Sequence, residues 1–142
     1  MTRAYYSTVL DHSADQVWSK IQDFNDDRWS GVVTKSYSEN NQSGSTVGTI
    51  RYHEFDGKVA RSDLRAYSSV GRFLTYGFVG TPPVSVDNYE ATLRVLPVVD
   101  GNRAFVEWQA TFDCPEPDRK HWMERLGGSF ANWLDSLRES LA

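Results

Sequence analysis

Two stretches late in the chain alternate strictly between apolar and polar residues. Alternation with a period of two is typical of a strand that covers a core with one of its faces. The pair Asp100–Gly101 separates the two stretches and is typical of a tight turn. The pattern therefore predicts a hairpin of strands over 86–98 and 102–113 with one apolar face. The residues expected on that face are Tyr89, Ala91, Leu93, Val95, Val106, Trp108, Ala110 and Phe112.

Five further segments carry strand signals, namely alternation together with β-branched and aromatic residues. They predict strands over 3–10, 32–39, 47–55, 58–68 and 72–79. From residue 32 to residue 113 every connection is too short for a crossover helix, so we expect neighbouring strands to be antiparallel. Asp56–Gly57 favours a type I′ turn, because Gly adopts a positive φ without a steric penalty.

A first short helix is expected directly after the first strand. Ser13 and Gln16 form a capping-box pattern, in which the serine hydroxyl accepts from an early helix N–H and the glutamine reaches back. Val17 and Ile21 follow at helical spacing. Together these residues predict a helix over 14–22.

A second short helix is predicted over 24–29. Three acidic residues, Asp23, Asp26 and Asp27, lie near its start, where carboxylates complement the positive end of the helix dipole. Gly31 is expected to end it. We favour this capping role for the three carboxylates over a role as paired groups in acid chemistry, which would require two of them to face each other across a cleft.

The last part of the chain has helical periodicity. Apolar residues recur at 123, 126, 130, 134, 137 and 141, which is one stripe of an amphipathic helix over 118–141. Gly127 and Gly128 lie in its middle, where each glycine costs about 1 kcal/mol relative to alanine. Their missing side chains would leave space, let the helix bend, or allow close packing against a bulky strand residue such as Trp108.

These elements predict an α+β fold in a single domain over residues 1–142. A sheet with one apolar face must cover that face, and the long C-terminal helix has the matching stripe. We therefore expect a curved seven-stranded antiparallel sheet wrapped around the C-terminal helix, with two short helices after the first strand. A twisted sheet diverges from a straight helix at one end, so this arrangement leaves a gap for loops or for a ligand.

Charge and composition argue against several classes of function. The formal net charge is −4 and no run of Lys or Arg occurs, which argues against nucleic acids and anionic membranes as partners. A single cysteine, Cys114, cannot form an internal disulfide. The chain shows no signal-peptide core and no stretch of roughly 18 apolar residues. We therefore expect a cytoplasmic protein without membrane insertion, as a monomer or a weak homodimer.

The residues also resemble a known superfamily. Matching motifs extend through most of the chain: Ser13–Trp18, Asp23–Phe24, Trp29, Val47–Arg51, Pro83–Tyr89, Leu93–Pro97, Val106–Trp108 and Phe112–Asp113. In these motifs and in element order the chain resembles the helix-grip fold of the START/Bet v 1-like (SRPBCC) superfamily, and within it the polyketide cyclase/dehydrase and lipid-transport group. The rival is a ketosteroid-isomerase-like cone, but that fold places its long helices before most strands.

The resemblance implies a hydrophobic small-molecule ligand in a cavity between the sheet and the C-terminal helix, with neither a metal nor a cofactor. Members of the group bind lipids, polyketides, hormones or other apolar molecules there, and some catalyse cyclisation or dehydration. The ligand-binding residues expected here are Trp29, Arg51, Tyr76, Phe78, Tyr89, Trp108, Phe112, Met123, Leu126, Gly127 and Phe130. One departure is Ser62, where many relatives, as we align them, carry a glutamate.

Arg51, His53 and Tyr76 are the candidate catalytic residues. Arg51 and His53 share one face of the 47–55 strand, and the sequence leaves open whether that face points inward. Facing inward, Arg51 could bind a carboxylate or enolate and His53 could act as a general acid or base. Facing outward, both would be surface residues. No spacing of His, Cys, Asp or Glu suggests a metal site.

Three functions are compatible with these residues. The favoured one is a carrier or sensor of a hydrophobic molecule, because aromatic residues make up 13% of the chain and obvious catalytic groups are few. The alternative is an enzyme of the cyclase or dehydratase kind that acts on a polyketide-like or other apolar substrate in the same cavity. The third is a ligand-gated partner-binding protein, with the loop 80–85 as lid or switch; the sequence is equally compatible with a plain connector there.

Overall fold

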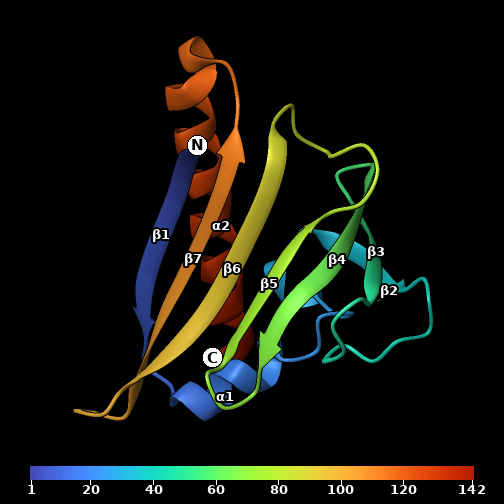
Figure 1. The fold of residues 1–142 in the computed structure, drawn as a ribbon. Helices are drawn as coiled ribbons and strands as arrows, with labels where there is room; N and C mark the ends of the chain where they lie inside the picture. The colour runs from blue at the N-terminus through green and yellow to red at the C-terminus, as the bar shows by residue number, and fades with distance from the viewer.

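Seven strands form one antiparallel sheet in the order β1-β7-β6-β5-β4-β3-β2. The computed structural model describes all residues, 1–142. The strands are β1 (Thr2–Leu10), β2 (Val33–Ser38), β3 (Ile50–Phe55), β4 (Lys58–Ser68), β5 (Phe73–Phe78), β6 (Asp87–Val98) and β7 (Arg103–Asp113). Each expected strand is present, and the fold class predicted from the sequence is confirmed (Figure 1).

The alternating hairpin forms the centre of the core. β6 and β7 pair so that Leu93 lies opposite Trp108 and Ala91 opposite Ala110. Every second residue is buried from Tyr89 to Val95 on β6 and from Ala104 to Phe112 on β7, as the sequence pattern predicted. The turn at Asp56–Gly57 has a positive φ at both residues, 48° and 69°, which is the type I′ geometry that joins β3 to β4.

The long helix α2 (Arg119–Leu141) packs against one half of the sheet. Its buried residues are Leu126, Phe130, Leu134 and Leu137, which belong to the apolar stripe of the sequence. Figure 1 shows α2 behind β1, β7 and β6, whereas β4, β3 and β2 lie to one side of it. The helix therefore covers only part of the apolar face of the sheet.

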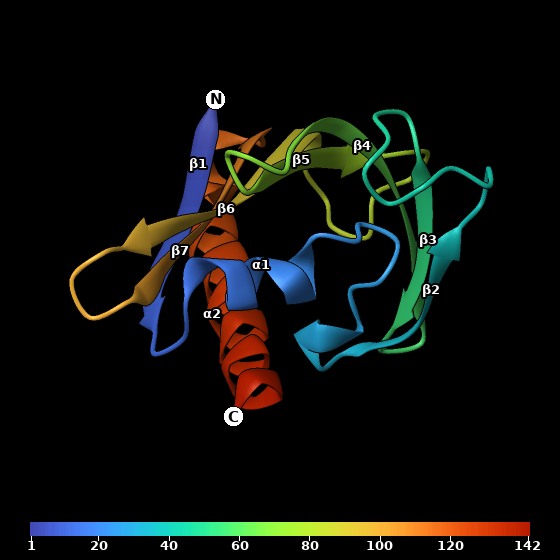
Figure 2. The same cartoon turned by 90° about the horizontal axis from the view of Figure 1, so that it is seen from below.

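The other half of the sheet curls away from α2. In Figure 2, seen from below, α1 (Ala14–Ile21) and the segment that follows it lie between α2 and the strands β2 and β3. α1 begins with the expected capping box: Gln16 N–H donates to Ser13 Oγ, and Ser13 N–H donates to Gln16 Oε1. The segment after α1 thus closes the space that a straight helix cannot reach.

The second short helix expected over 24–29 is not an α-helix. Residues 23–27 form a turn and loop, and only a 3₁₀ turn, η1 (Arg28–Ser30), follows them. The side chains explain this outcome, because Asp23 accepts from the backbone N–H of Asn25 and Asp26 from that of Arg28. Such local bonds offer the backbone an alternative to the helix.

The structure shows how α2 begins and what surrounds the two glycines in its middle. A second 3₁₀ turn, η2 (Glu116–Asp118), precedes the helix, and Asp118 makes no capping hydrogen bond through its side chain. A Cβ added at Gly127 would lie 3.7 Å from the carbonyl oxygen of Tyr5, and one added at Gly128 would meet nothing within 4 Å. Gly127 therefore lies over β1 rather than against Trp108.

We expect Leu134→Ala to lower the free energy of unfolding by about 2–5 kcal/mol, because it removes a fully buried side chain between α2 and the sheet. Leu96→Ala is the matched control, since Leu96 on β6 is 41% exposed and its truncation should cost about 1 kcal/mol or less. Urea unfolding followed by circular dichroism measures both. Equal losses in the two variants would mean that α2 does not anchor the core as described.

Candidate functional site

A pocket of about 270 Å³ lies where the sheet and α2 diverge. The sheet contributes residues of β2 to β7, α2 contributes a stripe of its surface, and the segment after α1 closes the remaining side. The principal lining residues are Phe24, Asp27, Trp29, Ser30, Arg51, His53, Leu74, Tyr76, Phe78, Tyr89, Leu93, Trp108, Leu126, Ser129 and Trp133. Of the 27 lining residues 15 are hydrophobic, so the pocket has mainly apolar walls.

Aromatic side chains make up much of the wall. Trp29 of η1 faces Trp108 of β7, with 5.9 Å between ring centroids. Trp108 Nε1 donates to the Tyr76 hydroxyl oxygen over 3.2 Å. Phe78 and Tyr89 stack at 4.6 Å between ring centroids. These contacts fix the rings without a guest molecule, so the apolar wall is already formed.

The polar part of the wall comes from β3. Arg51 and His53 point inward and are only 7% and 8% exposed. Both meet the carboxylate of Asp27, which lies directly before η1. His53 Nδ1 lies 2.7 Å from Asp27 Oδ2, and Arg51 Nη1 lies 3.5 Å from the same oxygen. A single carboxylate oxygen therefore joins the two strand residues to the opposite side of the pocket.

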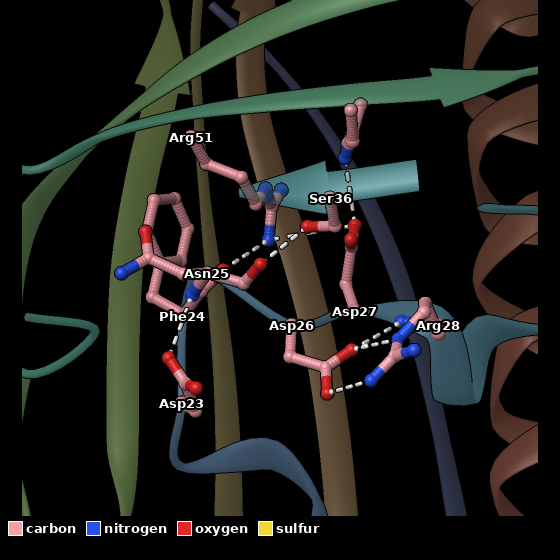
Figure 3. Close-up of polar contacts among 9 residues, drawn as sticks. Asp23, Phe24, Asn25, Asp26, Asp27, Arg28, Ser36 and Arg51 are labelled. Atoms are coloured by element: carbon pink, nitrogen blue, oxygen red, sulfur yellow. Dashed lines mark hydrogen bonds and ion pairs between the residues drawn. The ribbon is translucent and has the colours of Figure 1, made fainter. Parts of the chain in front are cut away.

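Local contacts hold the Asp27 loop and Arg51 in place (Figure 3). Arg51 Nη1 donates to the carbonyl oxygen of Phe24 over 3.2 Å, and the guanidinium lies 4.2 Å from the centroid of the Phe24 ring. The Ser36 hydroxyl of β2 donates to the carbonyl oxygen of Asn25. The loop is therefore tied to β2 and β3, and Asp27 is carried inward between them.

Their contacts with each other and with Arg51 shift the pKa values of Asp27 and His53. Burial by itself would raise the pKa of Asp27, but the charge of Arg51 and the hydrogen bond to His53 outweigh it and lower that pKa to about 2. Burial lowers the pKa of His53 from its ordinary value of 6.5; the hydrogen bond to Asp27 opposes this shift and the charge of Arg51 adds to it. Near neutral pH, Asp27 is ionised and His53 is neutral.

The tautomer of His53 follows from this protonation. An ionised carboxylate only accepts hydrogen bonds, so Nδ1 carries the proton and donates it to Asp27. Nε2 then holds a free lone pair and is the basic atom of the ring. Two phenols, Tyr76 and Tyr89, line the same pocket, and burial raises the pKa of each, so both remain neutral donors.

The structure brings most of the sequence-predicted site residues together. Seven of them line the pocket: Trp29, Arg51, Tyr76, Phe78, Tyr89, Trp108 and Leu126. His53, predicted as a catalytic candidate, lines it as well. The register of the 47–55 strand, which the sequence left open, points Arg51 and His53 inward.

Four of the predicted ligand-binding residues lie outside this lining. Phe130 stacks on Trp108 with 4.9 Å between ring centroids and is fully buried, as is Phe112. Gly127 lies over β1, as described above. Met123 is 43% exposed on α2. In the loop 80–85, Pro83 and Val84 line the pocket, and Asp56 of the β3–β4 turn does so too.

Sequence reasoning missed Asp27. It assigned this residue to the charged start of a helix, whereas the structure buries it against Arg51 and His53. Ser62 lies directly opposite Arg51 in the β3–β4 pair, and its buried hydroxyl has no partner. The carboxylate that meets Arg51 therefore comes from the loop before η1 and not from the neighbouring strand. No group of three or more His, Cys, Asp or Glu side chains is close enough to hold a metal ion.

We expect Asp27→Asn to lower the free energy of unfolding by about 3–5 kcal/mol, because it leaves the buried guanidinium of Arg51 without a counter-charge. Asp26→Asn is the matched control: Asp26 pairs with Arg28 at the surface, where such a pair contributes about 1 kcal/mol or less. Chemical unfolding of both variants tests this difference. A loss in Asp27→Asn no larger than in Asp26→Asn would contradict it.

Stability should fall as the pH falls below the ordinary histidine pKa of 6.5. The pKa of His53 is lower in the folded state than in the unfolded state, so the unfolded chain binds the proton at a higher pH. This binding stabilises the unfolded state relative to the folded one. Asp27 also causes a loss of stability on acidification, but at lower pH, because its folded-state pKa of about 2 lies below the ordinary value of 3.8.

Unfolding midpoints measured across this range should show a flatter pH dependence in His53→Gln just below the ordinary histidine pKa. The exposed His121 of α2 provides the control, since His121→Gln should keep the slope of the unmodified protein. An identical slope in His53→Gln and in the unmodified protein would show that His53 does not account for the acid sensitivity.

Comparison with known proteins places the chain in a family. A family model described as "Polyketide cyclase / dehydrase and lipid transport" matches residues 1–142. A protein from Nitrosospira multiformis is 27% identical with a TM-score of 0.84, over 99% of this chain and 96% of that one. A protein from Thermobifida fusca is 27% identical with a TM-score of 0.86, over 99% and 93%. Protein XoxI from Bacillus cereus has the same fold at 24% identity and a TM-score of 0.85, over 99% and 96%.

A comparison with curated proteins gives no match. None of the helices has the length and apolar character needed to cross a membrane. The solved structures support the fold, and the family model covers every residue described. The chain therefore belongs to the polyketide cyclase/dehydrase and lipid transport family.

Proposed function

We propose that this protein binds a compact hydrophobic small molecule in the pocket between the sheet and α2, as a carrier or sensor. The observation that carries this proposal is the preformed apolar pocket beside the buried Asp27, Arg51 and His53. Ligand pockets in proteins are mostly apolar with a few convergent polar groups, and this pocket has that character. Membership of a family named for polyketide and lipid partners is consistent with such a ligand.

The volume restricts the size of the ligand. About 270 Å³ lies just below the range of roughly 300–1,000 Å³ that is usual for small-molecule sites. A molecule of one or two rings, or a short chain, suits this space better than a long-chain lipid. The loop 80–85 contributes Pro83 and Val84 to the lining, so we place the entrance beside that loop.

A second candidate function is a cyclase or dehydratase in the same pocket. It is favoured by one observation, the pairing of His53 with Asp27, because a histidine oriented by a carboxylate is a common general base. Holding a flexible substrate in a reactive shape would supply further acceleration. Binding remains the first proposal, because it requires only the apolar pocket, whereas catalysis requires a substrate positioned against His53.

Titration with a panel of compact apolar molecules, including naphthalene and 1-decanol, should change the tryptophan fluorescence, because Trp29, Trp108 and Trp133 line the pocket. At least one member should bind with a dissociation constant in about the micromolar range. Ser129→Trp should weaken that binding by about tenfold or more, since residue 129 lines the pocket and a tryptophan there would occupy it. Isothermal titration calorimetry gives the affinities.

Glu139→Trp serves as the control, because Glu139 is exposed on α2 outside the pocket, and its affinity should equal that of the unmodified protein. A bound ligand that has a hydroxyl group distinguishes the two candidates when it is recovered after incubation: a carrier returns it unchanged, a dehydratase returns it without one water, and a cyclase returns an isomer of it. If no member of the panel binds and the protein purified from cells carries no small molecule by native mass spectrometry, the binding proposal is wrong.

A further inference from the structure

The polar atoms on the pocket wall divide into those with partners and those without. His53 bonds through Nδ1 only, and Arg51 through Nη1 only. The buried polar atoms that are both unpartnered and sealed from solvent include Arg51 Nε but not His53 Nε2 or Arg51 Nη2. These last two atoms therefore keep unused bonding capacity, and both residues line the pocket.

The two free atoms form a mixed pair. His53 Nε2 is an acceptor, because Nδ1–H is used on Asp27. Arg51 Nη2 is only a donor. The two side chains are neighbours, since both contact the same oxygen of Asp27. An acceptor beside a donor matches a hydroxyl group, whose hydrogen points to Nε2 and whose oxygen accepts from Nη2.

Other ligand groups fit this set less well. A carboxylate is already ionised near neutral pH, so it offers acceptors only and brings no proton for Nε2, and a cationic amine would meet the guanidinium of Arg51. An ether or a hydrocarbon would use none of the donors and would leave buried polar groups unpaired, which costs free energy. The apolar remainder of the pocket requires the rest of the ligand to be hydrophobic.

The charges favour transfer of the hydroxyl proton. With the pocket empty, burial and Arg51 keep His53 neutral. When a ligand hydroxyl gives its proton to Nε2, the new imidazolium lies against the ionised Asp27, and the ligand oxyanion lies beside Arg51. Each new charge then has an opposite charge in contact, so the pair of charges forms together although neither is stable there alone.

The inference from these observations rests on the proposed binding function and defines the chemical class of its ligand. We propose that the pocket takes a weakly acidic hydroxyl compound, a phenol or an enol on a compact apolar body, and binds it as the oxyanion. In this step the ligand O–H bond breaks, an N–H bond forms at His53 Nε2, and the electron pair stays on the ligand oxygen, held by Arg51 Nη2. An aliphatic alcohol is too weak an acid for this transfer.

Several charged groups surround this step. Those that act on His53 are Asp27 from the loop before η1 and Arg51 from its own strand. The other charged residues that line the pocket are Asp23, Asp26, Asp56, Lys58 and Arg125. Asp27 and Arg51 are in contact and have opposite charges, so the site is close to neutral before the ligand binds. The ligand hydroxyl then supplies both the proton that His53 takes up and the oxyanion that balances its charge.

The probe pair 4-nitrophenol and 4-nitroanisole tests the proposal. Both have the same apolar body, but only the phenol has a proton to give, and its anion has a visible absorption band that the neutral form lacks. At a pH about one unit below the pKa of the free phenol, the unmodified protein should convert the bound phenol to its anion. It should also bind the phenol about tenfold or more tightly than the anisole.

A variant assigns the effect to His53. In His53→Gln the visible band of bound 4-nitrophenol should disappear and its affinity should fall to that of 4-nitroanisole, whose own affinity should not change. His121→Gln, on the exposed surface of α2, should behave as the unmodified protein.

A measurement on the unmodified protein makes the test independent of variants that fold poorly. The ¹⁵N resonances of the His53 ring should show a free Nε2 in the empty protein and a protonated Nε2 when 4-nitrophenol is bound. If both probes bind equally and the phenol keeps its proton, or if the anion binds while Nε2 stays free, the inference is overturned and the binding function stands. If neither probe nor any member of the apolar panel binds, both fail.

Discussion

The structure depends on the mismatch between a curved sheet and a straight helix. α2 can follow β1 and its neighbours β7 and β6, but it cannot follow the sheet as it bends toward β3 and β2 (Figures 1 and 2). Right-handed twist accumulates from strand to strand, so the divergence grows with distance from the helix. The apolar face of β3 to β5 must therefore be covered by something else, and the segment after α1 covers only part of it.

This mismatch explains why a polar cluster lies in an apolar interior. The segment 23–30 has no regular helix to satisfy its backbone, so its carbonyl groups and side chains bond to the strands it covers. Arg51 and Ser36 donate to carbonyl groups of this segment, and Asp27 receives His53. The cluster thus has a structural task as well as a chemical one: it closes the open side of the sheet and supplies the charges of the pocket.

Asp27, Arg51 and His53 together give one side of the apolar pocket a defined set of charges and hydrogen-bonding groups. Burial separates the ionised Asp27 from water and keeps His53 neutral, so the free lone pair at Nε2 coexists with the guanidinium of Arg51, which contacts the same oxygen of Asp27. Aromatic rings on the remaining walls exclude water and keep these interactions in a low dielectric. A ligand would therefore be held by its apolar body and distinguished by a single polar group. The family model alone makes no such distinction, because a fold of this kind serves several functions.

The sequence by itself determined the elements whose burial follows from local geometry. Alternation placed Tyr89, Leu93 and Trp108 on the inner face of the sheet, and the stripe at 126, 130, 134 and 137 gave α2, because the directions of side chains along a strand or helix repeat with a fixed period. The capping box of α1 and the turn at Asp56–Gly57 were also predictable, since both depend on neighbouring residues only.

Only the tertiary structure decided the composition of the polar site. The alternation of β3 is compatible with Arg51 and His53 on either face, and pairing with β2 and β4 selects the inner one, because a slip of one residue would reverse every side chain. Asp27 lies more than twenty residues before both of its partners, so no local pattern connects them. Its aspartate neighbours bond within the loop, whereas Asp27 turns inward, a difference that arises from how the chain closes over the sheet and not from residue type.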